Sequence, residues 1–367
     1  MRLLLDTKLR KKPFRYDVDI RYPLVKTRTV PAYDEAVVLH YLAAPRTRKV
    51  SYMFGDYLRH FHAGTAPALL QLAEGSRSAS PHGRAGDSKV LRVAESPIEN
   101  EPKPKKKNLI YTIAIDPPNE PHRQMMAKML ASSIFRTGFS GDVIVLTNYE
   151  RRLFEHGRDN LQEIYLDLSR IPPSKTGKEM PDFKYRSRHF IPAERYEKVM
   201  YVDCECLFLK NPDKLFDGGA KIMFSEQPRQ NITGKSFNAY LTKEEMKTLK
   251  ARGMNSGFWW IAGHRFQEVL ARWERINARP SVRGGSVSDQ DSWVRLLLDT
   301  KLRTKPFRPD VDVLYPMVES RRAHAFDGAS LLHYSSGGTE TVSYMFGDYM
   351  RHFHAETAPG LLHFIDG

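Results

Sequence analysis

Three apolar runs, each the length of a buried strand, place the strongest constraint on the fold. LIYTIAI (109–115), DVIVLTN (142–148) and KVMYVDCECLFL (198–209) are rich in β-branched and aromatic residues and stop at polar or turn-forming residues. Residues 120–136, between the first two runs, repeat apolar side chains at helical spacing. This order predicts an α/β fold with a Rossmann-like, mostly parallel sheet flanked by helices. In such sheets, ligands bind beyond the carboxyl ends of the strands.

Composition excludes several classes of protein. The 367 residues are 41% hydrophobic and 27% charged, as in globular rather than disordered, collagen-like or coiled-coil chains. No apolar run approaches the roughly 18–20 residues of a membrane span, and Asp6 interrupts the first apolar stretch too early for a secretory signal. The two cysteines, Cys204 and Cys206, suit neither a disulfide framework nor a zinc site. We therefore expect a cytoplasmic protein, with peripheral contact at the inner membrane face left open.

The net charge of +14 is unevenly distributed. Residues 1–107 carry most of the excess, whereas residues 108–367 hold 36 basic and 32 acidic side chains, a net of only +4. A basic excess is typical of nucleic-acid binding. Such binding would have to use residues 1–107 and to weaken steeply with salt, and for the main part of the chain we predict no nucleic-acid partner.

The chain contains a copy of its own C-terminal segment. RLLLDTKLRKKPFRYDVD (2–19) returns almost unchanged as RLLLDTKLRTKPFRPDVD (295–312), within a longer match of residues 1–75 to residues 294–367. Solenoid arrays need three or more closely spaced repeats, so two distant copies are not an array. The first copy is either a gene-fusion remnant or a spare segment that packs on the main domain or exchanges with its twin.

The copies are separated by a stretch rich in Ser, Pro, Gly and charge, which predicts a flexible basic linker over residues 76–107. The predicted organisation is therefore a duplicated segment (1–75), this linker and one large globular domain (108–367). Formation of a homodimer is left open.

An acidic pair ends the third apolar run. In Asp203-Cys204-Glu205 the alternation of a strand would place both carboxylates on one face. Burying two carboxylates is costly unless a cation joins them. Mg²⁺ or Mn²⁺ bound to a diphosphate supplies that charge. Alternatively, one carboxylate pairs with a Lys or Arg and the other faces water.

The surroundings of this pair are similar to a known family. RSRHFIPAERYEKVMYVDCECLFLKNPDKLF (186–216) resembles the Asp-x-Asp region of family 8 glycosyltransferases, the GT-A group that includes glycogenin and bacterial galactosyltransferases. MNSGFWWI (254–261), SDQDSW (288–293) and LLHYSSGG (331–338) resemble later family segments in the same order. The resemblance implies a GT-A fold and metal-dependent, retaining transfer of a hexose from a UDP-sugar. The acceptor would be a glycan, a lipid-linked molecule or a protein.

The resemblance also implies roles for particular residues. Asp203, Glu205 and His333 would hold Mn²⁺ or Mg²⁺, and Asp203 would thereby bind the donor as well. Arg186, seventeen residues before Asp203, would touch the donor, and Asp116 would bind its nucleobase. Each of three residues also has an alternative interpretation. His333 would be a core histidine, Arg186 would form a surface salt bridge, and Asp116 would belong to an ordinary Asp-Pro turn.

Further positions concern the sugar. Asn255 resembles the amide that holds the donor sugar, and Asp289 would bind its hydroxyls. Gln290 would stabilise the reacting carbon, and Asp291 is a third polar candidate, unless this acidic run only caps a helix. Residues 279–288 would close over the donor.

One position departs from the family. Family members carry a Lys six residues after the metal-binding His, and Thr339 stands there. The loss of this cation favours an alternative function, a catalytically weak relative that binds a nucleotide-sugar or glycan as a scaffold. The first copy carries Arg46 six residues after His40, so we hypothesise that it competes with residues 294–367 for one docking place.

Two aromatic features have structural interpretations. Trp259 and Trp260 are expected in the core. Residues 343–354 have the spacing of a packed terminal helix. Contact of that helix with a membrane surface is the alternative.

Overall fold

The computed structural model describes residues 20–21, 38–39, 107–116, 122–150, 152–154, 158–170, 179–282, 287–308, 312–316, 328–334 and 339–354. The chain divides into two units, residues 1–83 and residues 84–367. The predicted linker and most of the predicted duplicate lie outside the described residues, and their boundaries stay predictions.

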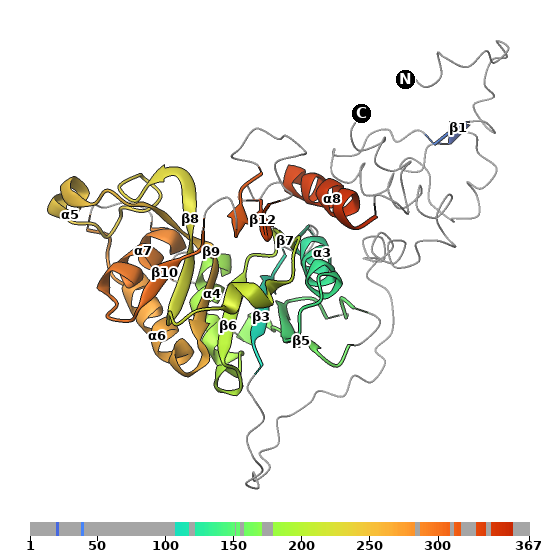
Figure 1. Cartoon of the computed structure of the whole chain (residues 1–367), viewed down its shortest axis with the longest axis horizontal. Helices are drawn as coiled ribbons and strands as arrows, with labels where there is room; N and C mark the ends of the chain where they lie inside the picture. The colour runs from blue at the N-terminus through green and yellow to red at the C-terminus, as the bar shows by residue number, and fades with distance from the viewer. Residues whose placement is uncertain are drawn as a thin grey trace, which may run out of the picture. The chain divides into compact units, whose positions relative to one another are not determined.

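A seven-stranded sheet forms the centre of the second unit, in the order β10-β8-β9-β6-β3-β4-β5 (Figure 1). Strands β6, β3, β4 and β5 are parallel, β9 runs antiparallel to β6 and β8, and β10 is parallel to β8. The strands span β3 (Leu109–Ala114), β4 (Asp142–Thr147), β5 (Leu161–Tyr165), β6 (Lys198–Val202), β8 (Ile222–Asn231), β9 (Arg252–Ala262) and β10 (Thr304–Pro306).

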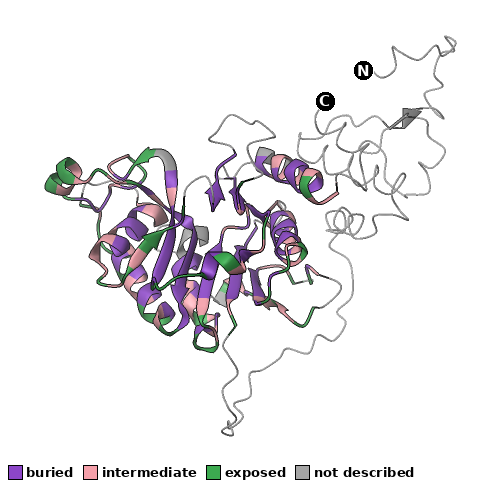
Figure 2. Cartoon of the chain, viewed as in Figure 1, coloured by how far each residue is buried: buried purple, intermediate pink, exposed green. Residues whose placement is uncertain are grey.

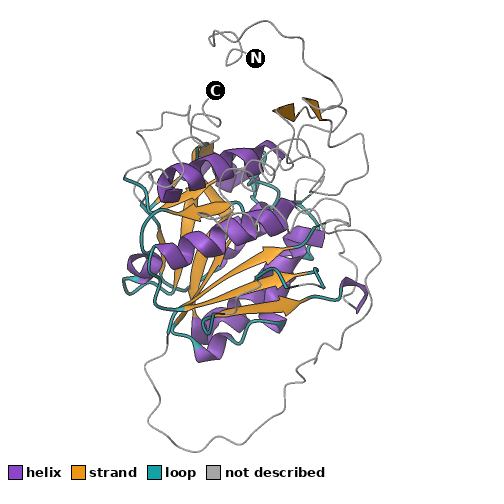
Figure 3. Cartoon of the chain, turned by 90° about the vertical axis from the view of Figure 1, so that its right-hand side faces the viewer, coloured by secondary structure: helices purple, strands orange, loops and turns teal. Residues whose placement is uncertain are grey.

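Helices cover this sheet on both faces (Figure 3). They are α3 (His122–Arg136), α4 (Glu179–Arg186), α6 (Phe266–Asn277) and α7 (Asp289–Asp299), whereas the short helix α5 (Lys243–Thr248) has no buried residue and lies away from the sheet (Figure 1). The central strands β3, β4, β6 and β9 are buried (Figure 2), with hydrophobic side chains on both of their faces, whereas the edge strands β5 and β10 are partly exposed. The predicted α/β fold with a mostly parallel sheet is confirmed.

The core on the side of α4, α6 and α7 is aromatic. Trp259 from β9 stacks on Trp293 from α7 at 5.2 Å between ring centroids, and Trp273 from α6 lies 4.7 Å from Trp293. Trp259 and Trp260 are fully buried, as expected of core residues. This packing fixes α7, and therefore its N-terminal acids, against the centre of the sheet.

The predicted helix over 120–136 and the strands over 109–115 and 142–148 are confirmed as α3, β3 and β4. The single strand predicted over 198–209 is wrong. The chain forms β6, breaks at residues 203–205, and resumes as β7 (Cys206–Phe208) in another sheet. The break places both acids where the chain crosses from one sheet to the other, rather than within a strand.

The second sheet has the order β11-β12-β7. Here β11 (Val313–Leu314) is parallel to β12 (Leu331–His333), and β12 is antiparallel to β7. Helix α8 (Thr339–His354) packs on α3, where the Ser132 and Tyr349 hydroxyl oxygens are 2.6 Å apart. The packed helix predicted over 343–354 is therefore confirmed as part of α8.

Among the helices that can be described, none has the length and apolarity required to span a bilayer. In the first unit, β1 (Ile20–Arg21) pairs in parallel with β2 (Val38–Leu39).

Candidate metal centre

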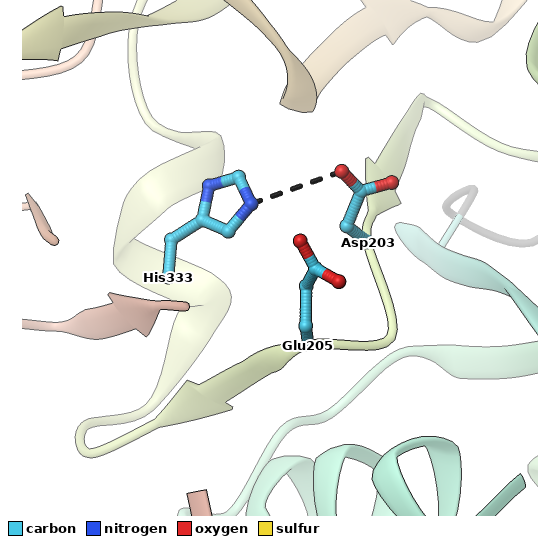
Figure 4. A group of neighbouring side chains, drawn as sticks. All are labelled: Asp203, Glu205 and His333. Atoms are coloured by element: carbon cyan, nitrogen blue, oxygen red, sulfur yellow. Dashed lines mark ion pairs between the residues drawn. The ribbon is translucent and has the colours of Figure 1, made fainter. Parts of the chain in front are cut away.

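Three potential metal ligands converge where the chain passes from the large sheet to the small one (Figure 4). Asp203 follows β6, Glu205 precedes β7, and His333 ends β12. One ligand atom from each residue lies within 4.8 Å of the other two. The imidazole points toward both carboxylates (Figure 4), with Nε2 of His333 3.7 Å from Oδ2 of Asp203. The ends of three strands thus bring together the triad that the sequence suggested.

A buried lysine lies beside this triad. The Nζ atom of Lys184, in the last turn of α4, is 3.2 Å from Oδ1 of Asp203 and 2.9 Å from Oδ2 of Asp289. The Ser256 hydroxyl donates to the same Asp289 oxygen at 2.7 Å, and the Tyr201 hydroxyl donates to Asp203 at 2.5 Å. Lys184 therefore links the triad to the first residue of α7.

The two carboxylates of the triad differ in protonation. Burial raises the pKa of Asp203, but the Lys184 ammonium and the His333 ring outweigh burial and hold that pKa well below its usual range. Burial, and then the charge of Asp203, raise the pKa of Glu205 to about 8. Burial by itself would lower the pKa of Lys184, yet its two carboxylate partners raise it. Of the two acids, Asp203 therefore ionises first and Glu205 holds its proton to higher pH.

A glycine makes room for the triad. A Cβ atom on Gly257 would lie 2.2 Å from Oδ2 of Asp203 and 2.6 Å from Cε1 of His333, closer than Cβ contacts occur. Asn255, two residues earlier on β9, accepts a hydrogen bond from the Gly257 amide at 2.6 Å and donates one to Gln227 at 2.6 Å. The predicted sugar-binding amide thus lies at the edge of the triad, oriented by Gly257 of its own strand and by Gln227 of β8.

The two acids at the start of α7, Asp289 and Asp291, have different surroundings. Asp289 and its partner Lys184 border the triad. Asp291 instead accepts bonds from the Ala239 amide at 2.8 Å and from the Ser288 amide at 2.9 Å, and it forms a capping box with Ser288. These bonds account for Asp291 as a helix cap, which was the alternative interpretation of this run, and its place in the chemistry stays a prediction.

Gln290, between these two acids, has a buried Oε1 atom without a hydrogen-bond partner in the described part of the chain. The loop predicted to close over the donor (279–288) is described only at its ends, since residues 283–286 lie outside the described residues.

The two remaining predicted residues lie near the same edge of the sheet. Asp116 follows β3, which is parallel to β6, and its carboxylate accepts bonds from the amides of Arg123 at 2.9 Å and Gln124 at 3.0 Å. It thereby caps α3 and is placed by that helix. Arg186 is half-buried and ends α4, two residues after Lys184.

The donor set fits a hard divalent cation. Two carboxylates and one imidazole are suitable ligands for Mn²⁺. The ring is buried and its Nδ1 atom has no hydrogen-bond partner among the described residues, so either ring nitrogen can carry the proton and Nε2 can be the unprotonated ligand. The residues present therefore fit such an ion.

Lys184 was missed by the sequence analysis. The spacing rule carried by the family resemblance pointed to Arg186, and neighbours two apart on a helix project in different directions. The sequence gives little indication of the role of Lys184, because nothing nearby distinguishes a buried lysine from the solvent-exposed lysines around it.

Comparison with known proteins gives a fold rather than a family. No family model matches this sequence, and no curated protein matches it. Among solved structures, the apo form of WbbM, a bifunctional glycosyltransferase, is similar with a TM-score of 0.51 and 12% identity. The match covers 72% of this chain and 52% of that chain, so this chain spans about half the length of its solved counterpart. The chain thus has an α/β fold similar to that of a glycosyltransferase.

Proposed function

We propose that this protein is a metal-dependent glycosyltransferase of the family 8 type, which moves a hexose from a UDP-sugar to an acceptor with retention of configuration. The observation that carries the proposal is the convergence of Asp203, Glu205 and His333 at the carboxyl end of a central parallel strand. The similarity of the fold to a glycosyltransferase supports it. Ligands in open α/β sheets bind at this edge.

In this proposal Asp203, Glu205 and His333 hold Mn²⁺ or Mg²⁺. The bound ion supplies neutralisation of the negative charge that grows on the departing diphosphate. Asp203 is prepared for this role because Tyr201 and Lys184 fix its carboxylate and keep it ionised.

In this proposal neighbouring residues bind the sugar. Asp289 accepts hydrogen bonds from its hydroxyls and Asn255 donates hydrogen bonds to them, while Gln290 offers its buried Oε1 to the electron-poor ring carbon in the transition state. Asp116 and Arg186 contact the base and the phosphates, respectively. The acceptor is a glycan, a lipid-linked molecule or a protein.

Lys184 could replace the phosphate-binding Lys of family members. At the position of that Lys this chain has Thr339, the first residue of α8. Lys184 is a buried cation within reach of the triad, and we assign it the stabilisation of negative charge in this site. If Lys184 remains bound to its two acids instead, leaving-group stabilisation is weak, which favours the alternative of a nucleotide-sugar-binding scaffold.

The proposal is tested by calorimetric titration of UDP with and without Mn²⁺. We expect binding that requires the metal and is lost in Asp203→Asn and Glu205→Gln. The matched control is Asp217→Asn, because Asp217 is an exposed acid outside the site. Metal-independent or absent UDP binding in the folded wild-type protein would overturn the proposal.

Turnover separates the two candidate functions. Metal-dependent release of UDP from a UDP-hexose, with or without an acceptor, indicates an enzyme. Metal-dependent UDP binding without any release of UDP across a panel of UDP-hexoses indicates the scaffold.

A further inference from the structure

The imidazole of His333 lacks the contact that usually orients a metal-binding histidine. Such a histidine commonly donates its other ring N–H to a carboxylate or a backbone carbonyl, which fixes the ring. Among the described residues, Nδ1 of His333 has no hydrogen-bond partner, although the residue is almost completely buried. Its Nε2 atom nevertheless lies 3.7 Å from Oδ2 of Asp203. Within the described part of the chain, packing rather than a hydrogen bond to Nδ1 therefore orients this ring.

The neighbouring ring of Tyr315 provides such packing. Leu314 pairs with Leu332 where β11 runs parallel to β12, so Tyr315 and His333 are the next residues in register. Residues in register on adjacent strands project to the same face of a sheet. The two rings lie 5.1 Å apart between centroids, with 35° between their planes, and both residues are buried. The phenol ring thus packs directly against the imidazole.

Two other neighbours of the imidazole are small. Cys206 lies opposite His333 on the antiparallel strand β7. Gly257 of β9 approaches the ring so closely that a Cβ atom there would lie 2.6 Å from Cε1 of His333. Of these three neighbours, Tyr315 has the only large and rigid side chain. It is therefore the residue whose shape can determine how the imidazole is turned.

The phenol of Tyr315 also reaches the large sheet. Burial raises the pKa of Tyr315, and the nearby side chain of Ser225 opposes this rise. Ser225 lies on β8 of the large sheet, where the pairing of β8 with β9 shifts its register. One side chain thus extends from His333 in the small sheet to the large sheet, whose strand β6 leads into Asp203.

We propose that Tyr315 is a positioning residue of the metal centre, which holds the His333 imidazole so that Nε2 faces the two carboxylates. Close packing against a rigid neighbour restricts the rotation of a buried ring. A ligand that is fixed in advance loses less conformational freedom when the ion binds, so binding is tighter. The effect on metal binding rests on the proposed function, whereas the orientation of the ring in the metal-free protein does not.

Substitutions of Tyr315 test this role through the affinity for Mn²⁺, measured by electron paramagnetic resonance. Tyr315→Leu removes the ring, and we expect the affinity to fall about 10–100-fold, as when the support of a metal ligand is lost. Tyr315→Phe keeps the ring and should keep the affinity. The control is Tyr349→Leu, at a buried tyrosine of α8 whose hydroxyl contacts Ser132, and its affinity should be unchanged. Wild-type affinity in Tyr315→Leu would overturn the proposal.

A double-mutant cycle separates positioning from a general structural effect. If Tyr315 acts through His333, then Tyr315→Leu should cause no further loss of Mn²⁺ affinity in a His333→Ala background. An equal loss in both backgrounds would show that Tyr315 supports only the fold, and would overturn the proposal. The electron spin-echo modulation from an imidazole nitrogen bound to Mn²⁺ should be present in wild type and Tyr315→Phe and weakened in Tyr315→Leu.

The orientation of the ring can also be measured without metal. Because Gly257 approaches Cε1 of His333 closely, its α-hydrogens should give a nuclear Overhauser effect to the ring hydrogen on Cε1. In protein labelled at glycine and histidine, we expect this signal to persist in Tyr315→Phe and to weaken in Tyr315→Leu. An unchanged signal in Tyr315→Leu would overturn the positioning role. Failure of the wild-type protein to bind Mn²⁺ would instead refute the proposed function, while this signal still decides the orientation of the ring.

Discussion

The acids at the start of α7 and the acids between β6 and β7 look alike in the sequence but have different surroundings. Asp291 accepts hydrogen bonds from two backbone amides and one hydroxyl. The side chain of Glu205 has no ion pair or hydrogen bond within the described residues, and its pKa is raised to about 8 by burial and by Asp203. A carboxylate whose oxygens accept hydrogen bonds from the protein supports structure, whereas one that shares a site with another acid either keeps its proton or is available to a cation.

Removing the cation that the protein already supplies should have the largest effect. In Lys184→Met, Asp203 and Asp289 lose their shared partner in a buried site, which we expect to cost about 3–5 kcal/mol of folding free energy. Urea denaturation measures the loss. Mn²⁺ should raise the melting temperature of this variant more than that of wild type. Lys247→Met, at an exposed lysine, is the control. An equal rise of the melting temperature with Mn²⁺ in Lys184→Met and in wild type would contradict a cation site beside Lys184.

Closing the space beside Asp203 should come next. Gly257→Ala places a methyl group 2.2 Å from a carboxylate oxygen, and relief of this overlap should cost about 1–3 kcal/mol and displace a ligand of the triad. We expect Mn²⁺ binding, followed by electron paramagnetic resonance, to be lost. In Gly219→Ala the nearest atom is 3.6 Å away, so both stability and binding should be retained. Normal Mn²⁺ affinity in Gly257→Ala would break the assignment of Asp203 as a ligand.

The helix-capping acid should affect stability without affecting the metal. Asp291→Ala removes the capping box of α7 and leaves the Ala239 amide without its acceptor. We expect a loss of about 1–3 kcal/mol in urea denaturation and an unchanged affinity for Mn²⁺. A parallel loss of Mn²⁺ affinity at full stability would remove the contrast between the two groups of acids.

The smallest expected effect is a dependence of stability on pH. Glu205 has a raised pKa in the folded protein, so the native state holds its proton more tightly than the unfolded chain, whose pKa is near 4.5. The contribution is present below pH 4.5 and is lost as the pH rises toward 8. In EDTA, thermal melting should therefore show wild type losing stability over this range relative to Glu205→Gln. Identical pH profiles would show that folding leaves the pKa of Glu205 unchanged, against this expectation.

The sequence predicted the strands and the helix that build the fold because their apolar patterns are local and strong. It also selected Asp203, Glu205 and His333, which the structure brings together. It did not predict the break at residues 203–205, since hydrophobicity continues on both sides of the acids. Lys184 could not be found either, because its role depends on the distant Asp289 and on the packing of α7.

The break between the two sheets has a thermodynamic consequence. Asp203 directly follows a strand of the large sheet, whereas His333 ends a strand of the small sheet, and α8 comes next in the chain. A cation held by both residues is a non-covalent cross-link between these parts, and its binding energy adds to the stability of the C-terminal segment. Amide hydrogens of β12 and α8 should then exchange with solvent more slowly as the metal concentration rises. The supply of metal would thus control how firmly this end of the protein is held, apart from any effect on catalysis.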